Sequence, residues 1–222
     1  MKKIMFSDKY GLTKAVLEGR KTHTRRILHC PKTFGGKYVS GFRLCTNQKG
    51  SQFAYLVDED ECEIEGSVNI LSAYKFGEEV AVAQSYQTVM RYYHSLGNVS
   101  TRVVSEEENT FWNAMRNIES TGNDSAMQGD NNKMFVRADL MPHRIKINNI
   151  RIERLQDISE EDCLKEGIKR KNKRYVIENE KGVCFYTNDV ILAFRYLIDK
   201  TCGKGTWRRN PYVFVYDFEL IK

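Results

Sequence analysis

The sequence has few prolines and no long apolar run. Pro accounts for 3 of its 222 residues, so we expect no long disordered linker. No apolar run approaches the ~20 residues that a membrane-spanning helix needs. The first eleven residues, MKKIMFSDKYG, also lack the apolar segment that follows the lysines of a secretory signal. These absences predict a cytoplasmic protein that makes no contact with a membrane.

The cysteines form no recognisable motif. No two of them make a CxxC pair, and no Cys/His cluster has the spacing of zinc ligands. We therefore expect reduced thiols, mostly buried as small apolar side chains, and neither a bound metal nor any other cofactor. The six residues are Cys30, Cys45, Cys62, Cys163, Cys184 and Cys202.

Positive charge is present in moderate excess and is unevenly distributed. The net charge is +6, and residues 1–29 hold eight Lys and Arg against two acids. A second basic run, KEGIKRKNKR, spans Lys165 to Arg174, whereas acids gather in DEDECEIE from Asp58 and in EEE from Glu106. Separated charge of this kind indicates either a face that binds an anion or ordinary solvated surfaces.

Hydrophobic periodicity predicts many strands and a few short helices, without βαβ alternation. The expected strands and hairpins lie at 37–59, 78–86, 143–155, 174–187 and 211–221, and the expected helices at 7–19, 105–118, 158–167 and 188–203. This pattern favours an α+β fold built around a small β-barrel or curled sheet with flanking short helices. The polar stretch 119–132 is expected to be a mobile loop.

Three of the helices carry capping signals. Ser105 with Glu108, and Ser159 with Asp162, have the spacing of a capping box, and Asn188 is the expected cap of the last helix. The first helix is expected to end near Gly19.

Directly after that first helix comes GRKTHTRR, residues 19–26. Within it, Gly19, Lys21, Thr24 and Arg26 form the pattern G-x-K-x-x-T-x-R at the junction of a helix and an extended segment. In these residues the sequence resembles the ASCH family, placed in the PUA-like superfamily. Phage and prophage members offer further matches, to AVLEGRKTHTRRIL, RIERLQDISEEDCLKEGI and AFRYLIDKTCGKGTWRRNPYVFVYDFE.

The resemblance implies one domain over residues 1–222, a PUA-like barrel with a basic cleft, and RNA or a nucleotide as ligand. Segments of about 38–65 and 87–132 look like insertions into that pattern. One related protein is a small amidohydrolase that deacetylates N4-acetylcytidine, and another is a reported ribonuclease.

Carried over from that amidohydrolase, the catalytic residues are Lys21, Thr24 and Glu166. Amide hydrolysis needs a nucleophile, a base and an acid, and these three side chains supply the necessary groups. Neighbouring arginines would lower the pKa of Lys21 toward that of a useful base. The residues expected to bind substrate or an anion are Arg26, Arg25, Gly19 and Arg20.

Two features complicate the enzyme hypothesis. In a regular strand Lys21 and Thr24 would face opposite sides, so their cooperation needs an irregular turn after Gly19. Where the relatives carry Val-Arg-Glu, this chain has Val82-Ala83-Gln84, which removes a cation and a carboxylate.

Three functions therefore stay open from the sequence. The first is a hydrolase that acts on a modified nucleoside or, like a ribonuclease, on RNA. The second is a non-catalytic module that binds RNA or a nucleotide. The third is a phage accessory protein that binds a host protein through its insertion.

Overall fold

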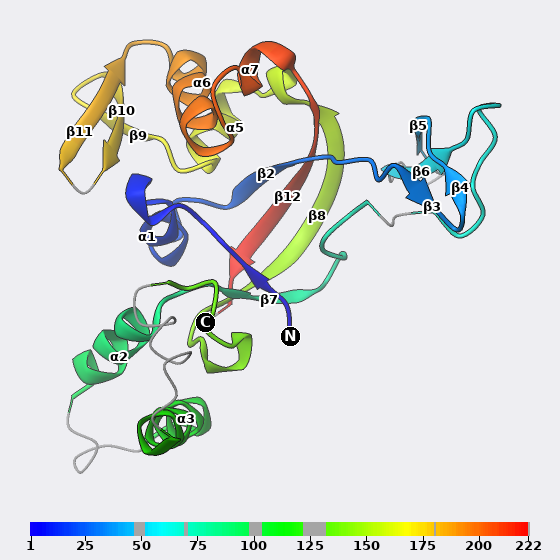
Figure 1. The fold of residues 1–222 in the computed structure, drawn as a ribbon. Coiled ribbons are helices and arrows are strands. Elements are labelled where there is room, and N and C mark those ends of the chain that lie inside the picture. The colour runs from blue at the N-terminus through cyan, green and yellow to red at the C-terminus, as the bar shows by residue number, and fades with distance from the viewer. Residues whose placement is uncertain (47–51, 69–70, 98–103, 122–131, 180, 222) are drawn as a thin grey trace.

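A five-stranded sheet forms the centre of the fold in the computed structural model (Figure 1). The structure describes residues 1–46, 52–68, 71–97, 104–121, 132–179 and 181–221. The strands, in their order across the sheet, are β1 (Lys3–Ile4), β7 (Glu79–Val82), β8 (Arg144–Arg154), β12 (Tyr212–Leu220) and β2 (His23–Ile27). β1 runs parallel to β7, and all other neighbours are antiparallel.

The predicted barrel is wrong for the part of the chain that the structure describes. β1 and β2 are the two edges of the sheet, and no strand pairing joins them among the described residues. β1 is only two residues long, which leaves little backbone to close a cylinder. Instead, the Arg26 side chain reaches across, and its Nη2 donates to the Met5 carbonyl oxygen at 2.5 Å. The architecture is a mixed α/β fold with an open central sheet and several smaller sheets.

Both faces of the central sheet are covered. The alternation of β12 puts Phe214 and Tyr216 into one hydrophobic cluster, together with Val16 of helix α1 (Leu12–Leu17). It puts Val213 and Val215 into a second cluster on the other face. β12 is therefore apolar at successive positions, as expected of a strand that is buried on both sides.

The second cluster joins the central sheet to a smaller three-stranded sheet. That sheet has the order β11 (Gly182–Thr187), β10 (Arg174–Asn179), β9 (Lys169–Lys171) and packs against helix α6 (Val190–Thr201) (Figure 1). The rings of Phe185 and Tyr196 stack across this contact, with their centroids 4.3 Å apart. Helices α5 (Glu160–Lys165) and α7 (Thr206–Arg209) also contact α6.

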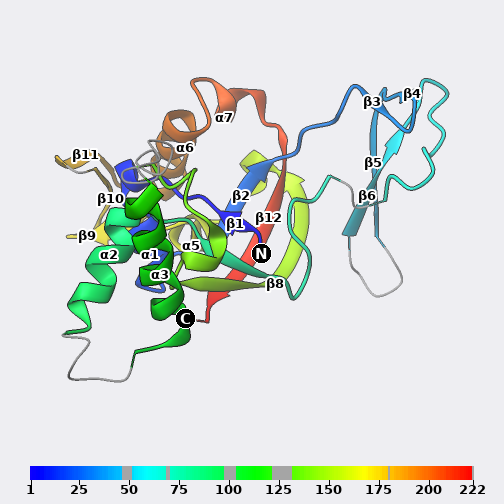
Figure 2. The same cartoon turned by 60° about the horizontal axis from the view of Figure 1, so that its bottom comes forward.

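Two further parts flank this body on opposite sides (Figure 2). Helices α2 (Tyr86–Ser95) and α3 (Glu106–Thr121) share a hydrophobic cluster with the end of β7, and α2 was not predicted. On the other side a lobe contains β3 (Thr33–Phe34), β4 (Lys37–Tyr38), β5 (Gly41–Thr46) and β6 (Gln52–Val57). The antiparallel pairing of β5 and β6 confirms the predicted hairpin, although its turn and most of the polar stretch 119–132 lie outside the described residues.

Among the residues that the structure describes, short 3-10 helices occupy three connections. They are η1 (Asp8–Tyr10), η3 (Ala138–Leu140) and η4 (Leu155–Asp157). η1 leads directly into α1, and η4 leads into the N-cap of α5.

Two of the three predicted helix caps are confirmed. Ser105 Oγ accepts from the Glu108 backbone N–H at 3.2 Å, and Ser159 Oγ accepts from that of Asp162 at 3.1 Å. The cap predicted at Asn188 is wrong, because the carboxylate of Asp189 accepts from two amides of the first turn of α6.

The expectation that the cysteines are mostly buried is also wrong. All six are free thiols, and Cys163 is the only one that is buried. It sits in α5 against the second cluster, while Cys30, Cys62 and Cys202 are exposed.

Candidate functional site

The GRKTHTRR segment contains the irregular turn that cooperation of its side chains requires. Gly19 follows α1 with φ of +69°, a backbone conformation that favours glycine. The Lys21 amide then donates back to the Ala15 carbonyl oxygen at 2.9 Å. β2 begins only at His23, so Lys21 lies before the strand and is not bound by its alternation.

The structure brings Lys21 and Glu166 together across 145 positions of sequence. Lys21 Nζ lies 2.5 Å from Glu166 Oε2 and donates to the Glu166 carbonyl oxygen at 2.9 Å. The two residues are 2% and 4% exposed, so the pair is sealed from solvent. Glu166 is the C-cap residue of α5, and Gly167, with φ of +101°, carries the chain past Lys21. A Cβ at Gly167 would stand 3.5 Å from that of Lys21.

Burial lowers the pKa of the Lys21 amine, and the adjacent Glu166 carboxylate opposes that change. Arg26 and Arg25 lower the pKa of Lys21 further. The predicted contribution of Arg20 is not seen, since its guanidinium lies at the surface and pairs with Glu18 at 2.6 Å.

Thr24 and Arg26 make no hydrogen bond to the Lys21–Glu166 pair among the described contacts, although Arg26 lies close enough to lower the pKa of Lys21. Both side chains belong to the opposite face of β2 from His23 and Arg25. The Arg26 guanidinium lies 5.7 Å from the centroid of the Phe6 ring, and Lys21 Nζ lies at the same distance from that ring. Among the described contacts, no hydrogen bond joins Thr24 to Lys21 or Glu166. Two of the three predicted catalytic side chains are therefore in contact.

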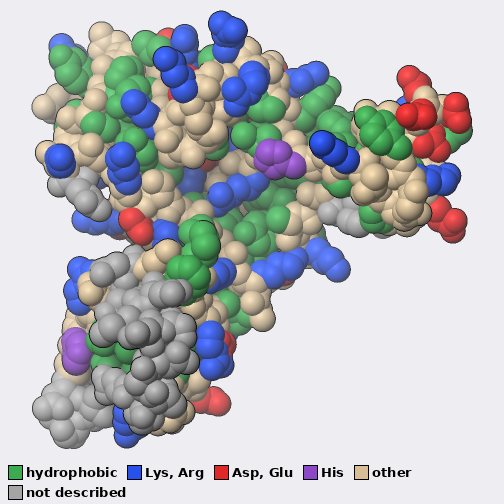
Figure 3. All heavy atoms as spheres, in the orientation of Figure 1, with side chains coloured by type: hydrophobic (Ala, Val, Ile, Leu, Met, Phe, Trp, Pro, Cys, Tyr) green, Lys and Arg blue, Asp and Glu red, His purple; other side chains and the backbone are tan. Residues whose placement is uncertain are grey.

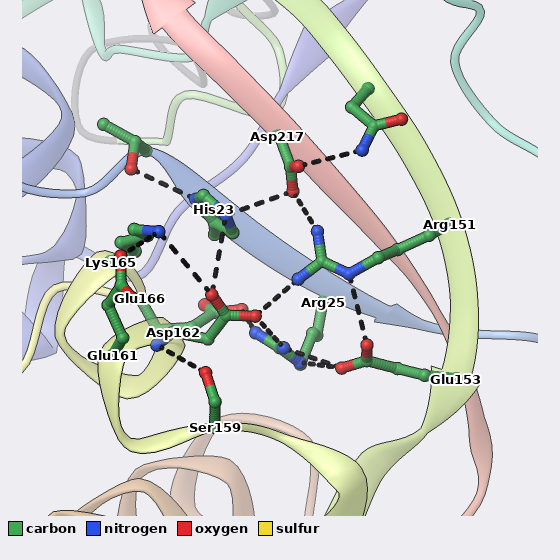
Figure 4. Close-up of polar contacts among 12 residues, drawn as sticks. His23, Arg25, Arg151, Glu153, Ser159, Glu161, Asp162, Lys165, Glu166 and Asp217 are labelled. Carbon is green, nitrogen blue, oxygen red and sulfur yellow. Dashed lines mark hydrogen bonds and ion pairs between the residues drawn. The ribbon is translucent and has the colours of Figure 1, made fainter.

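Arg25 is at the centre of a network of charged side chains (Figure 4). Its side chain is 1% exposed, and all three of its nitrogens donate to carboxylates. The partners are Glu153 at 2.7 Å, Asp162 at 2.9 Å and Glu166 at 3.1 Å. Because its donors are used inside the protein, Arg25 holds carboxylates together and does not face an external anion.

The network continues across the sheet to Arg151, His23 and Asp217 (Figure 4). Arg151 pairs with Asp162 and, at 2.6 Å, with Asp217, and His23 Nε2 lies 3.2 Å from Asp217 Oδ1. The sequence analysis did not find this network. A local pattern in the sequence did point to it. Charged residues two positions apart in a strand lie on the same face of the sheet. Arg151 and Glu153 of β8 have this spacing, and so do His23 and Arg25 of β2.

We expect His23 to make the protein less stable in mild acid. Burial lowers the pKa of its imidazole despite the facing carboxylates of Asp217 and Asp162, and the cations Arg151 and Lys165 act in the same direction as burial. In the unfolded chain the imidazole takes up a proton near pH 6.5. The unfolded state therefore binds more protons, and the free energy of unfolding falls as the pH drops from about 7 to 5.

Urea unfolding of wild type and of His23→Gln at several pH values measures this effect. His143 contributes in the same direction, because burial also lowers its pKa. We expect His23→Gln to flatten the pH dependence and the double variant with His143→Gln to flatten it further. An unchanged slope in His23→Gln would contradict the assignment.

A pocket of about 470 Å³ lies next to the Lys21–Glu166 pair, between η1, α1 and β10. Its walls include the apolar residues Leu12, Val176 and Leu197, and Gly167 joins it to the end of α5. Lys21, Thr24, Glu166 and Arg26 do not line it. The volume is within the range of ~300–1,000 Å³ that is usual for small-molecule sites.

The pocket is continuous with a basic groove. Arg20, Ile168 and Lys169 line both, and Arg170, Lys171 and Leu164 complete the groove. Four of these six residues are cations. On the face shown in Figure 3, Lys and Arg side chains are spread over the body of the molecule. Acids gather at the far end of the β3–β6 lobe. We call the six residues the basic groove.

No family model, curated protein or solved structure matches this chain. The ASCH resemblance and the residue roles that it implies therefore stay predictions. Across the described ranges, no three His, Cys, Asp or Glu side chains gather as metal ligands. Within the same ranges, every helix is too short or too polar to cross a membrane.

The structure shows the surroundings of Ala83 and Gln84, the two positions at which the sequence differs from the ASCH pattern. Ala83 is fully buried in the cluster that holds α2 and α3, where it packs with Tyr86 and Phe111, so an arginine would not fit there. Gln84 is 3% exposed and lines the pocket, and its Oε1 lies 2.9 Å from His143 Nδ1. Gln84 thus places a neutral, positioned carboxamide at the pocket, at the position where the ASCH pattern that the sequence resembles has a glutamate.

Proposed function

We propose that this protein binds a nucleotide or a short stretch of RNA, with a base in the pocket and phosphate in the basic groove. The observation that carries the proposal is the continuity of the two sites, since Arg20 and Lys169 line both. A mostly apolar cavity beside a row of cations suits a ligand with an aromatic base and a phosphate. The ASCH resemblance agrees with this ligand class.

The base-binding part combines apolar walls with a few polar groups. Gln84, Thr13 and Thr88 are polar residues of its lining, and the Thr13 hydroxyl donates to the Phe6 carbonyl oxygen at 3.2 Å. The contact with His143 fixes the Gln84 carboxamide oxygen, which leaves the amide nitrogen to donate to a base. Polar groups held in this way select the orientation of a ligand.

The phosphate-binding part is a set of exchangeable cations. Arg20 pairs with Glu18, and Lys169 pairs with Glu178, at the surface of the protein. Exposed ion pairs contribute at most about 1 kcal/mol, so a phosphate can compete for these cations. Charge-assisted bonds to phosphate are stronger than neutral hydrogen bonds.

Fluorescence anisotropy with a labelled ten-nucleotide single-stranded RNA tests the proposal. We expect binding, and we expect the logarithm of the association constant to fall linearly with the logarithm of the salt concentration, because each neutralised phosphate releases counterions. Absence of binding at about 50 mM salt, or an affinity that does not change with salt, would contradict it.

The Lys21–Glu166 contact favours a second candidate, hydrolysis of an amide such as that of N4-acetylcytidine. The amine with its lowered pKa supports base catalysis, but the burial of both groups ranks this candidate below binding. Release of cytidine from N4-acetylcytidine measures it, and Thr24→Val, which removes the hydroxyl, is expected to abolish it. Turnover that is absent in wild type, or equal in Thr24→Val, would rule out this mechanism.

A further inference from the structure

The sheet of β9, β10 and β11 has one face that α6 does not cover. Ile177 and Phe185, which pair across β10 and β11, point toward the second hydrophobic cluster and α6. Because side chains alternate along a strand, their neighbours Val176 and Tyr186 point to the opposite face. That outer face borders the pocket, because Val176 and Lys169 line it together with Ile177 and Leu197 from the side that α6 covers.

The outer face is strongly basic. The register pairs Lys171 with Arg174 and Lys169 with Val176, so Lys169, Lys171 and Arg174 stand on the same side. Glu178 is the single acid of the three strands as the structure describes them, and it lies between Lys169, at 2.5 Å, and Lys171. These two lysines lower the pKa of Glu178 to about 2, so at neutral pH it remains an anion beside both of them.

One aromatic ring stands among these cations. Tyr186 is 62% exposed, and the Arg174 guanidinium lies 5.2 Å from the centroid of its ring. A single exposed aromatic residue is ordinary by itself. Here it lies on a basic surface that begins at a pocket suited to a base, which is the combination that single-stranded nucleic acid requires.

We infer that the outer face of β9–β11 binds the nucleotides adjacent to the one in the pocket, with a base stacked on Tyr186 and phosphates near Lys171 and Arg174. The ligand of the whole site is then a single-stranded polynucleotide, because a paired base cannot expose its face to the ring. This inference rests on the proposed function, and it adds the length and the strandedness of the ligand.

The test compares a long and a short ligand in three variants. The ligands are a labelled ten-nucleotide oligocytidine RNA and cytidine 5′-monophosphate, and the variants are Tyr186→Ala, Tyr186→Phe and Tyr38→Ala. Tyr186→Ala is expected to weaken binding of the decamer roughly 5- to 150-fold, the range typical of one lost base stack. Tyr186→Phe keeps the ring and should bind like wild type. Tyr38→Ala removes an exposed ring from β4 in the β3–β6 lobe, away from this face, and should also bind like wild type (Figure 1).

The mononucleotide separates this inference from the proposed function. We expect its affinity to be equal in wild type and Tyr186→Ala, because it occupies the pocket alone. A decamer that binds Tyr186→Ala as tightly as wild type, or a duplex of the same length that binds as tightly as the single strand, would overturn the inference and leave the pocket proposal standing. Failure of the wild type to bind either ligand would overturn both.

Discussion

Replacing Lys21 with methionine is expected to lower the free energy of unfolding by about 3–5 kcal/mol. The substitution leaves Glu166 as a buried carboxylate without its closest cation, and the exposed fraction of Glu166 is only 4%. Arg25 would remain as its partner at 3.1 Å, but the amine that fills the space beside Oε2 would be gone. Urea denaturation followed by circular dichroism measures the change.

Lys14→Met is the matched control for this prediction. Lys14 belongs to α1, a few residues before Lys21, and its side chain is 75% exposed, so we expect a change within about 0.5 kcal/mol. The double variant Lys21→Met/Glu166→Gln should lose less free energy of unfolding than its two single variants lose in sum, since no buried charge is left unpaired. A Lys21→Met protein as stable as the Lys14→Met protein would contradict the buried pair.

The double variant Arg20→Ala/Lys169→Ala is expected to bind single-stranded RNA about 30-fold more weakly than wild type. These residues line both the pocket and the basic groove, and the estimate assigns ~1 kcal/mol to each lost phosphate contact. The slope of log affinity against log salt should fall in magnitude by about 1.4, because two phosphates are no longer neutralised.

A control variant with the same change in charge separates a local site from general attraction. Lys37 and Arg137 are 60% and 66% exposed at their side chains, and each pairs with an acid, as Arg20 and Lys169 do. Lys37→Ala/Arg137→Ala should bind RNA within a factor of about three of wild type. Equal losses in the two double variants would show that only the net charge matters.

Features that depend on neighbours in the chain could be predicted from the sequence. The N-cap bonds at Ser105 and Ser159 formed as expected, because a hydroxyl and an amide three residues apart meet whenever a helix begins. The alternation of residues 143–155 likewise predicted β8, because the strand has an apolar side toward the core. Asn188 and Asp189 are adjacent and both residue types are good N-caps, so the sequence did not determine which of them caps α6.

Features that depend on distant parts of the chain could not be predicted in this way. Closure of a barrel depends on whether β1 and β2 pair, and the two-residue length of β1 is set by its fit against β7. The Lys21–Glu166 contact was implied by the family resemblance alone, since no local pattern connects residues 145 positions apart.

The pocket and the charged network were missed for the same reason. The pocket combines Thr13, Gln84 and Val176 from three separate regions, and of these the sequence singles out Gln84 alone, as a departure from the family pattern. Arg151 and Asp217 look like ordinary strand residues until β8 and β12 pair, which lets Arg151 bridge Asp217 and Asp162.

The position of a bound nucleotide tests the central claim most directly. Isotope-labelled protein is titrated with each of the four ribonucleoside 5′-monophosphates in turn, and amide chemical shifts are followed by NMR. We predict saturable shifts at residues of the pocket and the basic groove, such as Thr13, Ile168 and Lys169, with the β3–β6 lobe unchanged. Shifts confined to other surfaces, or no saturable shift with any of the four nucleotides, would contradict the claim.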